Sequence, residues 1–453
     1  MFSNNLLMGA AAATSGESLV SVGNSALFDS ANSEYLSRTP SSAGNRDTWT
    51  ISYWVYKTYI TGAKAFFTAG SNNTNVTELR DQGTGILEYR HQDGGSVTDN
   101  IITTAIFRDI GWYHIVWAVD TTQAVESSRI ILYVNGERIT DFSTANYPAQ
   151  NADTDVNATV PTNIGARTGP DQHWSGYMAE AVLIDGLQLT PTSFGQYDST
   201  GTFWTPLSSA TIKGLTFGTN GFYLDNTTNA QTDASGEGNN FTNNNTVTTT
   251  ALMSPTQLPR LLWNPLSPLF IATLSQGNTK IASTGGVHEG AFANTNFPKT
   301  GKWQTEVLVD VSGSSSAIVS FAIMKNLSSE SLNQYIGDNS DAYGFYVYPT
   351  NQTFYSGTSA LFATGSVARS TFKYQICWDA SSGDGTADVY FGIDNTFYDN
   401  DGSTDGNPAT GANPTIENLD ISTSEWNLLG IPYDAGTLQT ADEDDWEYSI
   451  QSG

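Results

Sequence analysis

The chain has 453 residues and a net charge of −27, from 18 basic and 45 acidic side chains. Nucleic acids and anionic membrane surfaces attract proteins through positive charge, so this balance excludes both as principal partners. No run approaches the roughly 20 apolar residues that a membrane-spanning helix needs, so we expect no membrane insertion. Only 14% of the residues are charged, which disfavours surface helices and favours strands with small polar side chains on their solvent faces.

The length predicts two domains of about 200 residues each. We expect an N-terminal arm at 1–20, a first domain at 21–205, an extension and linker at 206–263, and a second domain at 264–453. Prolines at 265 and 268 mark the last boundary, because proline ends regular structure.

In the first domain, apolar and polar residues alternate with the period of a half-buried strand. The pattern is clear in 48–55 and again in 112–120. The apolar run 130–134 leads into Asn135-Gly136, which predicts a tight hairpin because both positions tolerate positive φ. A later strand over 176–184 is closed by a second turn at Asp185-Gly186.

In the second domain the same alternation recurs in 303–311, 343–347, 372–378 and 389–393. Short strands separated by Gly-rich turns, without helical windows between them, predict antiparallel sheets. The chain is therefore predicted to be all-β, with two antiparallel β-sandwich (jelly-roll) domains in tandem. The one cysteine, Cys377, falls inside a predicted strand, so we interpret it as a core residue rather than a reactive thiol.

Several first-domain motifs occur in the order seen in one family. They are Leu27-Phe28-Asp29, the run 48–55, Trp112-Tyr113-His114-Ile115-Val116, Leu132-Tyr133-Val134-Asn135-Gly136 and Tyr177-Met178-Ala179-Glu180. This order resembles laminin-G-like (concanavalin-like) domains over roughly residues 20–245. The segments 38–43 and 185–195 resemble the versions carried by structural proteins of marine bacteriophages.

The second domain resembles SPRY domains. The segment Gly301-Lys302-Trp303-Gln304-Thr305-Glu306-Val307 is similar to their G-K-W-Y-W-E-V strand, with Gln304 in place of the usual aromatic residue. The runs 343–345 and 376–379 stand where the next strands would be, and the later hairpin turn appears as Asp394-Asn395. The two resemblances imply two concanavalin-type binding folds in tandem. They also imply that the protein lies on the exterior of a virion, where it contacts other virion proteins.

No catalytic motif is present. Glycan hydrolases of this fold class use an E-x-D-x-x-E strand, whereas Glu306 and Asp310 stand four residues apart. The acid-dense run 442–447 is interpreted as a solvated tail. The four histidines show no zinc spacing, and His114 lies inside a predicted strand, so we interpret it as structural. Neither a G-x-S-x-G elbow nor a phosphate-binding loop occurs, and we expect no enzyme.

One acidic loop has the spacing of a calcium site. Asp399, Asp401, Ser403 and Asp405 occupy alternate positions around Gly402, as oxygen ligands of a hard cation do. The terminal glutamate of a full EF-hand loop is missing. The alternative, which we favour, is an acidic surface loop without a metal.

Aromatic residues in polar loops are candidate sugar platforms, because a pyranose ring has an apolar face. We predict that Trp174 and the preceding His173 in one such loop, and Tyr355 in a second one, bind a ligand. The alternative interpretation is that these aromatic side chains close the ends of the sandwiches.

Three functional hypotheses follow. The first is a phage fibre, appendage or head decoration that binds a host glycan or another virion protein. Such a protein would be a symmetric homo-oligomer, so that several weak binding sites together give tight binding through avidity. The second is a polysaccharide hydrolase or lyase. The third is a purely structural capsid cement or spacer.

Overall fold

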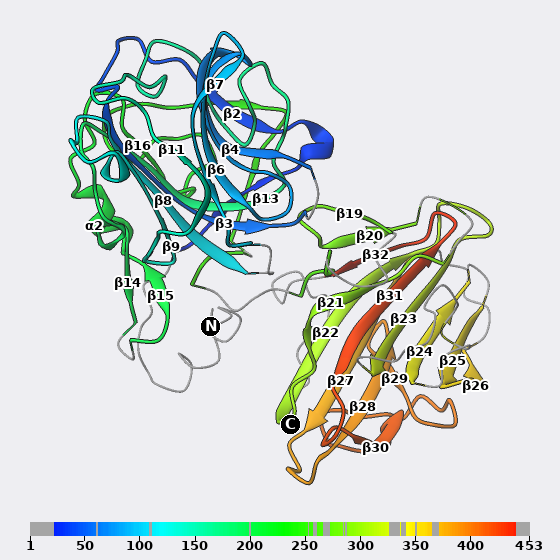
Figure 1. Cartoon of the computed structure of the whole chain (residues 1–453). Coiled ribbons are helices and arrows are strands. Elements are labelled where there is room, and N and C mark those ends of the chain that lie inside the picture. The colour runs from blue at the N-terminus through cyan, green and yellow to red at the C-terminus, as the bar shows by residue number, and fades with distance from the viewer. Residues whose placement is uncertain are drawn as a thin grey trace. The chain divides into compact units, whose positions relative to one another are not determined.

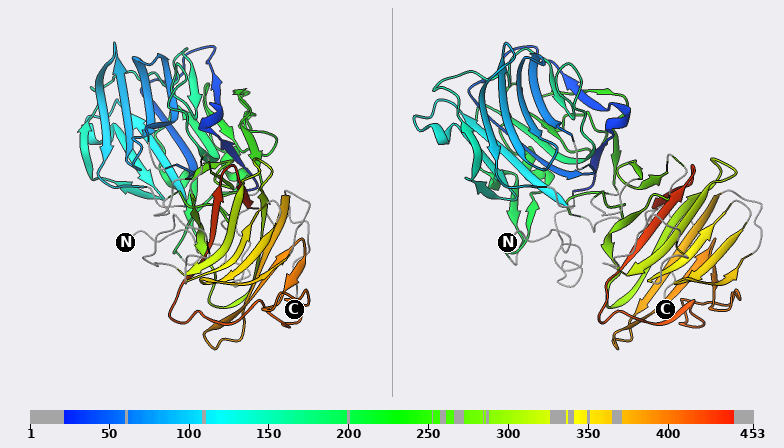
Figure 2. Two further views of the ribbon diagram at one scale, coloured as in Figure 1. Left: turned by 90° about the vertical axis from the view of Figure 1, so that its right-hand side faces the viewer. Right: turned by 45° about the vertical axis from the view of Figure 1, so that its right-hand side comes forward.

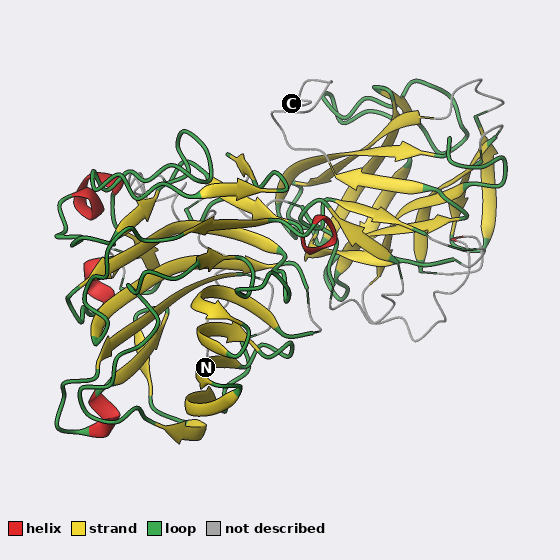
Figure 3. Cartoon of the chain, turned by 90° about the horizontal axis from the view of Figure 1, so that it is seen from above, coloured by secondary structure: helices red, strands yellow, loops and turns green. Residues whose placement is uncertain are grey.

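A computed structural model describes residues 22–440 apart from 60–61, 108–110, 199–200, 252, 257–260, 266–271, 284, 286–287, 326–335, 337–340, 349–350 and 365–370. The expected N-terminal arm and the acidic run 442–447 lie outside the described residues. The chain forms two compact units, Met1–Arg260 and Leu261–Gly453 (Figure 1). As predicted, it is almost entirely β, with only short helical turns (Figure 3). Among helices in the described residues, none is long and apolar enough to cross a bilayer.

The first unit is a sandwich of two eight-stranded antiparallel sheets. The first sheet runs, in spatial order, β10 (Glu137–Ile139), β9 (Ile130–Val134), β8 (Trp112–Asp120), β3 (Thr48–Lys57), β13 (Gly176–Asp185), β1 (Ser25–Phe28) and β18 (Thr248–Thr250), with β16 (Phe222–Leu224) paired to β13. The second sheet runs β11 (Phe142–Asn146), β7 (Ser96–Thr103), β6 (Leu87–Asp93), β5 (Asn75–Asp81), β4 (Lys64–Asn72), β12 (Thr162–Ile164), β2 (Tyr35–Arg38) and β17 (Thr242–Asn244).

Three smaller features complete this unit. A two-stranded ribbon joins β14 (Gly195–Tyr197) to β15 (Trp204–Pro206), and α2 (Ser209–Lys213) follows it. Single 3-10 turns occur at Ser30–Asn32, Glu126–Ser128 and Pro191–Ser193.

The central strands of the first sheet are buried on both faces. In β3, Trp49, Ile51 and Tyr53 point into the core between the sheets, as the alternation predicted. The opposite face is also covered, because Val116 and Val182 pack there against residues of the later chain, including Phe194 and Ile212. The polar residues of β3 are therefore interior as well.

The segment expected to be an extension and linker belongs largely to the first sandwich. β16 and β18 join the first sheet, and β17 joins the second. Arg38 ties this segment down by donating to the Asn220 carbonyl at 2.8 Å and to Asn239 Oδ1 at 2.6 Å. The three strands have three residues each, too short to show an alternation. The linker prediction is wrong for this part of the segment.

The second unit has one eight-stranded and one six-stranded antiparallel sheet (Figure 2). The larger sheet runs β19 (Thr273–Ser275), β20 (Lys280–Ala282), β32 (Thr437–Thr440), β22 (Gly301–Asp310), β27 (Thr371–Ala380), β28 (Thr386–Ile393) and β29 (Thr396–Tyr398), with β30 (Ile416–Asp420) paired to β28. The smaller sheet runs β21 (Ala291–Asn296), β31 (Trp426–Tyr433), β23 (Ile318–Lys325), β24 (Ala342–Val347), β25 (Gln352–Ser356) and β26 (Ser359–Ala363).

The larger sheet positions the candidate site. β22 and β27 pair over ten residues, from Gly301 opposite Ala380 to Asp310 opposite Thr371. Phe372, Tyr374 and Ile376 enter the core between the sheets. Cys377 is buried as predicted, although it lies on the outer face, in a small cluster with Tyr390 and Phe397.

Candidate functional site

The prediction that Trp174 forms a sugar platform is wrong, because this side chain is fully buried in the core of the first unit. Its ring packs against Phe28 and Phe66, with centroid distances of 5.4 and 5.8 Å. Its backbone N–H donates to the Gly165 carbonyl at 2.8 Å, which turns the loop inward. The neighbouring His173 is half-buried, with its ring 5.7 Å from that of Tyr35.

Tyr355 is half-buried on β25 of the second unit, and its ring lies 6.3 Å from that of Tyr346. The three predicted ligand-binding residues therefore belong to two different units. Their locations give no support to a single aromatic site.

The predicted calcium loop uses its oxygen atoms internally. Asp399 Oδ1 accepts from the backbone N–H of Asp401 at 3.0 Å and of Ser403 at 2.9 Å. Asp401 Oδ1 accepts from the Ser403 hydroxyl at 2.6 Å, and the Asp405 carbonyl accepts from Asn413. Within the described ranges, no group of three or more His, Cys, Asp or Glu side chains is arranged to hold a metal ion. Whether the loop binds calcium stays a prediction of the sequence.

A different aromatic residue is exposed. Of the tryptophans that the structure describes, only Trp303 is exposed, with 48% of its surface accessible. It stands opposite Trp378 in the β22–β27 pair, yet Trp378 is 1% exposed. The two tryptophans differ in exposure because the Phe297 ring stacks on that of Trp378, with a centroid distance of 4.7 Å, whereas Trp303 lies near the start of its strand. The Trp303 Nε1–H donates to the Thr300 carbonyl at 2.8 Å, which orients the indole.

Sequence analysis placed Trp303 in a strand but did not select it as a site residue. The available signal was the turn sequence before it, Lys299-Thr300-Gly301, which marks the residue as a strand end. Strand ends commonly project beyond the facing sheet, but the sequence does not say which ends do.

Trp303 borders a small depression on the larger sheet, which we call the Trp303 depression. Its volume is about 50 Å³, and it is lined by Lys302, Trp303, Gln304, Cys377, Trp378, Asp379, Tyr390 and Pro408.

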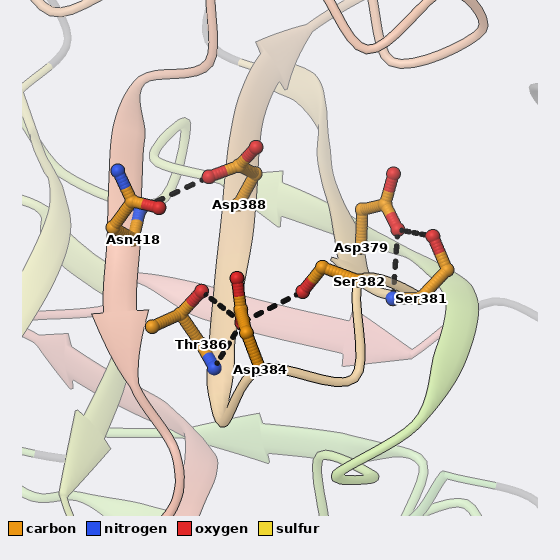
Figure 4. Close-up of a pocket in the computed structure, with 7 residues that line it drawn as sticks. All are labelled: Asp379, Ser381, Ser382, Asp384, Thr386, Asp388 and Asn418. Carbon is orange, nitrogen blue, oxygen red and sulfur yellow. Dashed lines mark hydrogen bonds between the residues drawn. The ribbon is translucent and has the colours of Figure 1, made fainter.

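Asp379 also lines an adjoining polar hollow of about 200 Å³ (Figure 4). Its other lining residues are Ser381, Ser382, Asp384, Thr386, Asp388 and Asn418. The strand register creates this arrangement, because Asp379 pairs with Lys302 on one side and with Asp388 on the other.

Hydrogen bonds hold the carboxylates of the hollow in place. Asp384 Oδ1 accepts from the hydroxyls of Ser382 and Thr386 at 2.8 and 2.6 Å. Asp388 Oδ1 accepts from the backbone N–H of Asn418 at 2.9 Å. Figure 4 shows a second oxygen on each of these carboxylates without a hydrogen bond to the residues drawn. These oxygens can accept from ligand hydroxyls.

Two of these carboxyl groups have lowered pKa values. Burial opposes ionisation of Asp379, but hydrogen bonds from Ser381 and from Lys302, whose Nζ lies 3.1 Å from Asp379 Oδ2, outweigh it and lower the pKa. Hydrogen bonds from Thr386 and Ser382 lower the pKa of Asp384. Both groups are ionised acceptors at neutral pH. Ionised acceptors suit the hydroxyl donors of a sugar. The Trp303 indole lies on the other face of the sheet, because Trp303 pairs with the core residue Trp378, whereas Asp379 is the next residue along β27.

The first unit holds a second charged cluster, on the outer face of its second sheet. Glu78 is buried beneath three arginines, with Arg90 at 2.6 Å and both Arg80 and Arg167 at 3.7 Å. Arg80 is also paired with Glu88 at 2.7 Å. These side chains are mostly buried and mutually paired, so the cluster offers little accessible charge.

Residues 30–186 match the family described as the concanavalin A-like lectin/glucanases superfamily. The first unit contains a laminin-G-like, concanavalin-like domain. This agrees with the resemblance found in the motifs of the first domain. No curated protein sequence matches the chain.

Solved structures with similar folds come from several sources. Domains LG4–5 of the mouse laminin alpha1 chain are 10% identical, over 94% of this chain and 92% of that one, with a TM-score of 0.30. The TRIM65 PSpry domain is 12% identical over 41% and 91%, with a TM-score of 0.28. The CBM40 of the Ruminococcus gnavus IT-sialidase is 13% identical over 38% and 96%, with a TM-score of 0.27. None of these similarities identifies a ligand of this chain or bears on a bacteriophage origin.

Proposed function

We propose that this chain is a non-catalytic glycan-binding protein on the exterior of a bacteriophage particle. The observation that carries the glycan-binding part is Trp303, an exposed indole oriented by its hydrogen bond to the Thr300 carbonyl. The ionised carboxylate of Asp379 lies on the other face of the same sheet. The concanavalin-like domain of the first unit adds support, because the name of its family covers lectins.

The virion part rests on the sequence. Segments 38–43 and 185–195 resemble bacteriophage structural proteins, and the charge of −27 suits a soluble, self-repelling particle surface. In this proposal the protein is a homo-oligomer that contacts other virion proteins. Several weak sugar sites on one particle would then bind a cell surface tightly through avidity.

The pKa values support a binding role over a hydrolytic one. Hydrolysis by a carboxyl pair needs one group that is protonated near neutral pH to act as the general acid. The pKa values of Asp379 and Asp384 are instead both lowered. Neither group is suited to donate a proton to a leaving oxygen.

A hydrolase is the second candidate, and one observation favours it. Asp379 and Asp388 stand directly opposite each other on β27 and β28. Opposed residues of antiparallel strands have Cβ atoms about 4.5–5.5 Å apart, which is compatible with a pair of carboxyl groups acting on one glycosidic bond.

The test combines binding and turnover. The purified chain is applied to a glycan array and to host cells, with reducing-sugar release measured in parallel. We expect binding without sugar release, and loss of that binding in Trp303→Ala. Tyr348→Ala is the matched control, because Tyr348 is another exposed aromatic of the second unit that lines neither hollow. Sugar release that is lost in Asp388→Asn would support the hydrolase instead.

The location is tested separately. Antibody labelling of intact particles, viewed by electron microscopy, is expected to decorate their outer surface. Labelling only after the particles are disrupted would contradict an exterior position.

A further inference from the structure

Lys57 and Asp81 form a buried ion pair at one end of the first sandwich. Lys57 is the last residue of β3 in the first sheet, and Asp81 is the last residue of β5 in the second sheet. The Lys57 Nζ lies 2.9 Å from Asp81 Oδ2, and the two side chains are 6% and 1% exposed. The pair therefore brings an amine and a carboxyl group from opposite sheets into contact, away from water.

The other carboxylate oxygen of Asp81 is held by two backbone donors. Asp81 Oδ1 accepts from the backbone N–H groups of Gly83 at 2.7 Å and of Gly85 at 2.9 Å. Both glycines have positive φ, 97° and 85°, a conformation that glycine adopts without strain. Two backbone donors on one oxygen are the arrangement that stabilises the oxyanion of a tetrahedral intermediate in acyl transfer.

A tyrosine hydroxyl lies at the remaining oxygen. Tyr59 donates to Asp81 Oδ2 at 3.3 Å, and this is the same oxygen that Lys57 contacts. Burial, reinforced by the charge of Asp81, raises the pKa of Tyr59 well above its usual value, so the phenol keeps its proton. Lys57 Nζ is 6.0 Å from the centroid of the Tyr59 ring. The phenol can therefore give a proton to Oδ2 and take one from the amine.

Confinement favours a reaction between the two groups of the pair. Holding an amine and a carboxyl group together in a folded chain replaces a bimolecular encounter, which raises their effective concentration greatly. Burial also disfavours both charged forms, so transfer of a proton from the ammonium to the carboxylate costs less here than in water. The product amide carries no charge and leaves no buried ions.

We propose that the Lys57 amine and the Asp81 carboxyl group condense into an amide that joins the two sheets of the first unit. The ammonium first gives one proton to the carboxylate. The neutral Nζ then attacks Cγ, and the N–H groups of Gly83 and Gly85 stabilise the oxyanion on Oδ1. The Cγ–Oδ2 bond breaks as a second proton moves from Nζ through Tyr59 to Oδ2, which leaves as water. One C–N bond forms, one C–O bond breaks, and no oxidant or reductant takes part.

The amide would do for this unit what a disulfide does elsewhere. The chain has one cysteine, Cys377, so no disulfide can form within it. The two residues are 24 positions apart, and a cross-link between them restricts the unfolded chain by closing a loop. This modification is independent of the proposed glycan binding.

Intact-mass spectrometry of the purified full chain tests the reaction directly. We expect the folded protein to be lighter than its sequence by the mass of one water molecule. Fragmentation of a tryptic digest should place the link between Lys57 and Asp81. A mass equal to the sequence mass after prolonged incubation of the folded chain would overturn the inference. The wild type gives this result by itself, so it does not depend on how a variant folds.

Lys57→Arg separates the cross-link from the ion pair. The guanidinium keeps the positive charge beside Asp81 but stays protonated and cannot attack the carboxyl carbon. The mass deficit should disappear, and the melting temperature of the first unit should fall by roughly 5–10 °C. A deficit that persists in this variant would overturn the assignment to Lys57.

Tyr59→Phe tests the proton transfer. This change removes the hydroxyl beside Asp81 Oδ2 and keeps the ring, and it should slow formation of the link about tenfold or more. The rate is measured as the growth of the lighter species after refolding from urea. An unchanged rate would overturn the role given to Tyr59.

A second lysine–aspartate pair in the same unit is the matched control. Lys213 Nζ lies 3.0 Å from Asp225 Oδ2, but the Lys213 side chain is 44% exposed. Asp225 Oδ1 accepts from the backbone N–H and the hydroxyl of a single residue, Thr227. This pair should stay unlinked in the same digest. A link at both pairs would show that contact alone suffices, and would overturn the role given to burial and to the two backbone donors.

Discussion

The indole Nε1–H of Trp204 donates a hydrogen bond to Nδ1 of His114 at 2.8 Å. Because Nδ1 accepts, the ring proton of His114 is on Nε2, which lies 2.8 Å from the Ser52 hydroxyl. Complete burial lowers the pKa of His114 to about 3, so the ring is neutral. The structural role that sequence analysis gave His114 is confirmed, and the bond fastens β15 to the outer face of the first sheet.

Breaking this bond should destabilise the first unit. Trp204→Phe keeps an aromatic ring but leaves His114 Nδ1 buried without a donor, at a cost of about 1–3 kcal/mol. Urea unfolding followed by circular dichroism measures the loss. Tyr197→Phe removes an exposed hydroxyl that bonds to Glu137 at 2.6 Å, and should cost less than about 1 kcal/mol. Equal effects of the two changes would contradict this assignment.

Glu180 should make the first unit less stable as pH rises. Burial raises its pKa to about 8, although the hydrogen bond from Tyr223 opposes this, and nearby Asp225 and Lys213 act in opposite directions. The unfolded value is 4.5, so the folded state holds the proton more tightly between these limits. This contribution is complete below pH 4.5 and is lost as pH rises towards 8.

Glu180→Gln removes the titrating group. The difference in unfolding free energy between this variant and the wild type should change steadily from pH 4.5 to 8 and level off on either side. Comparing the two proteins cancels other titrating groups, including His91. Burial lowers the pKa of His91, but the carboxylates of Asp155 and Asp99, which accept from its ring, outweigh burial and raise the pKa to about 9. A difference independent of pH would show that Glu180 is ionised throughout.

Removing the Glu78 charge should be costly. Glu78→Gln leaves Arg80, Arg90 and Arg167 close together without their shared buried partner, and we expect a loss of about 3–5 kcal/mol in unfolding free energy. The matched control is Asp153→Asn, which breaks the exposed pair between Arg46 and Asp153 and should cost at most about 1 kcal/mol. A small effect at Glu78 would mean that the arginines find other partners.

Glycan binding should tolerate mild acid. Because the pKa values of Asp379 and Asp384 are lowered, both carboxylates stay ionised as the pH falls through the range in which ordinary carboxyl groups begin to protonate. Affinity measured at pH 8 and at pH 5 should be the same. A decline between these values would place a carboxyl group with a raised pKa in the binding site.

Local patterns determined much of the fold. Alternation located the central strands of both units, and Asn135-Gly136 forms the expected turn, with φ of 50° and 84°. Asp394-Asn395 turns in the same way, with φ of 48° and 62°. These features depend on residues close in sequence, whose backbone preferences act before any distant contact forms.

Exposure of the aromatic residues was decided by distant segments. Trp174 stands in a polar loop but is buried, because Phe28 and Phe66 meet it from other strands. Trp303 continues an alternating strand but is exposed, because Phe297 covers its neighbour Trp378 instead. Periodicity states which face of a strand a side chain occupies, whereas burial depends on what else covers that face. The sequence by itself therefore determined strands, turns and the all-β class, and only the tertiary structure decided which aromatic side chains are exposed.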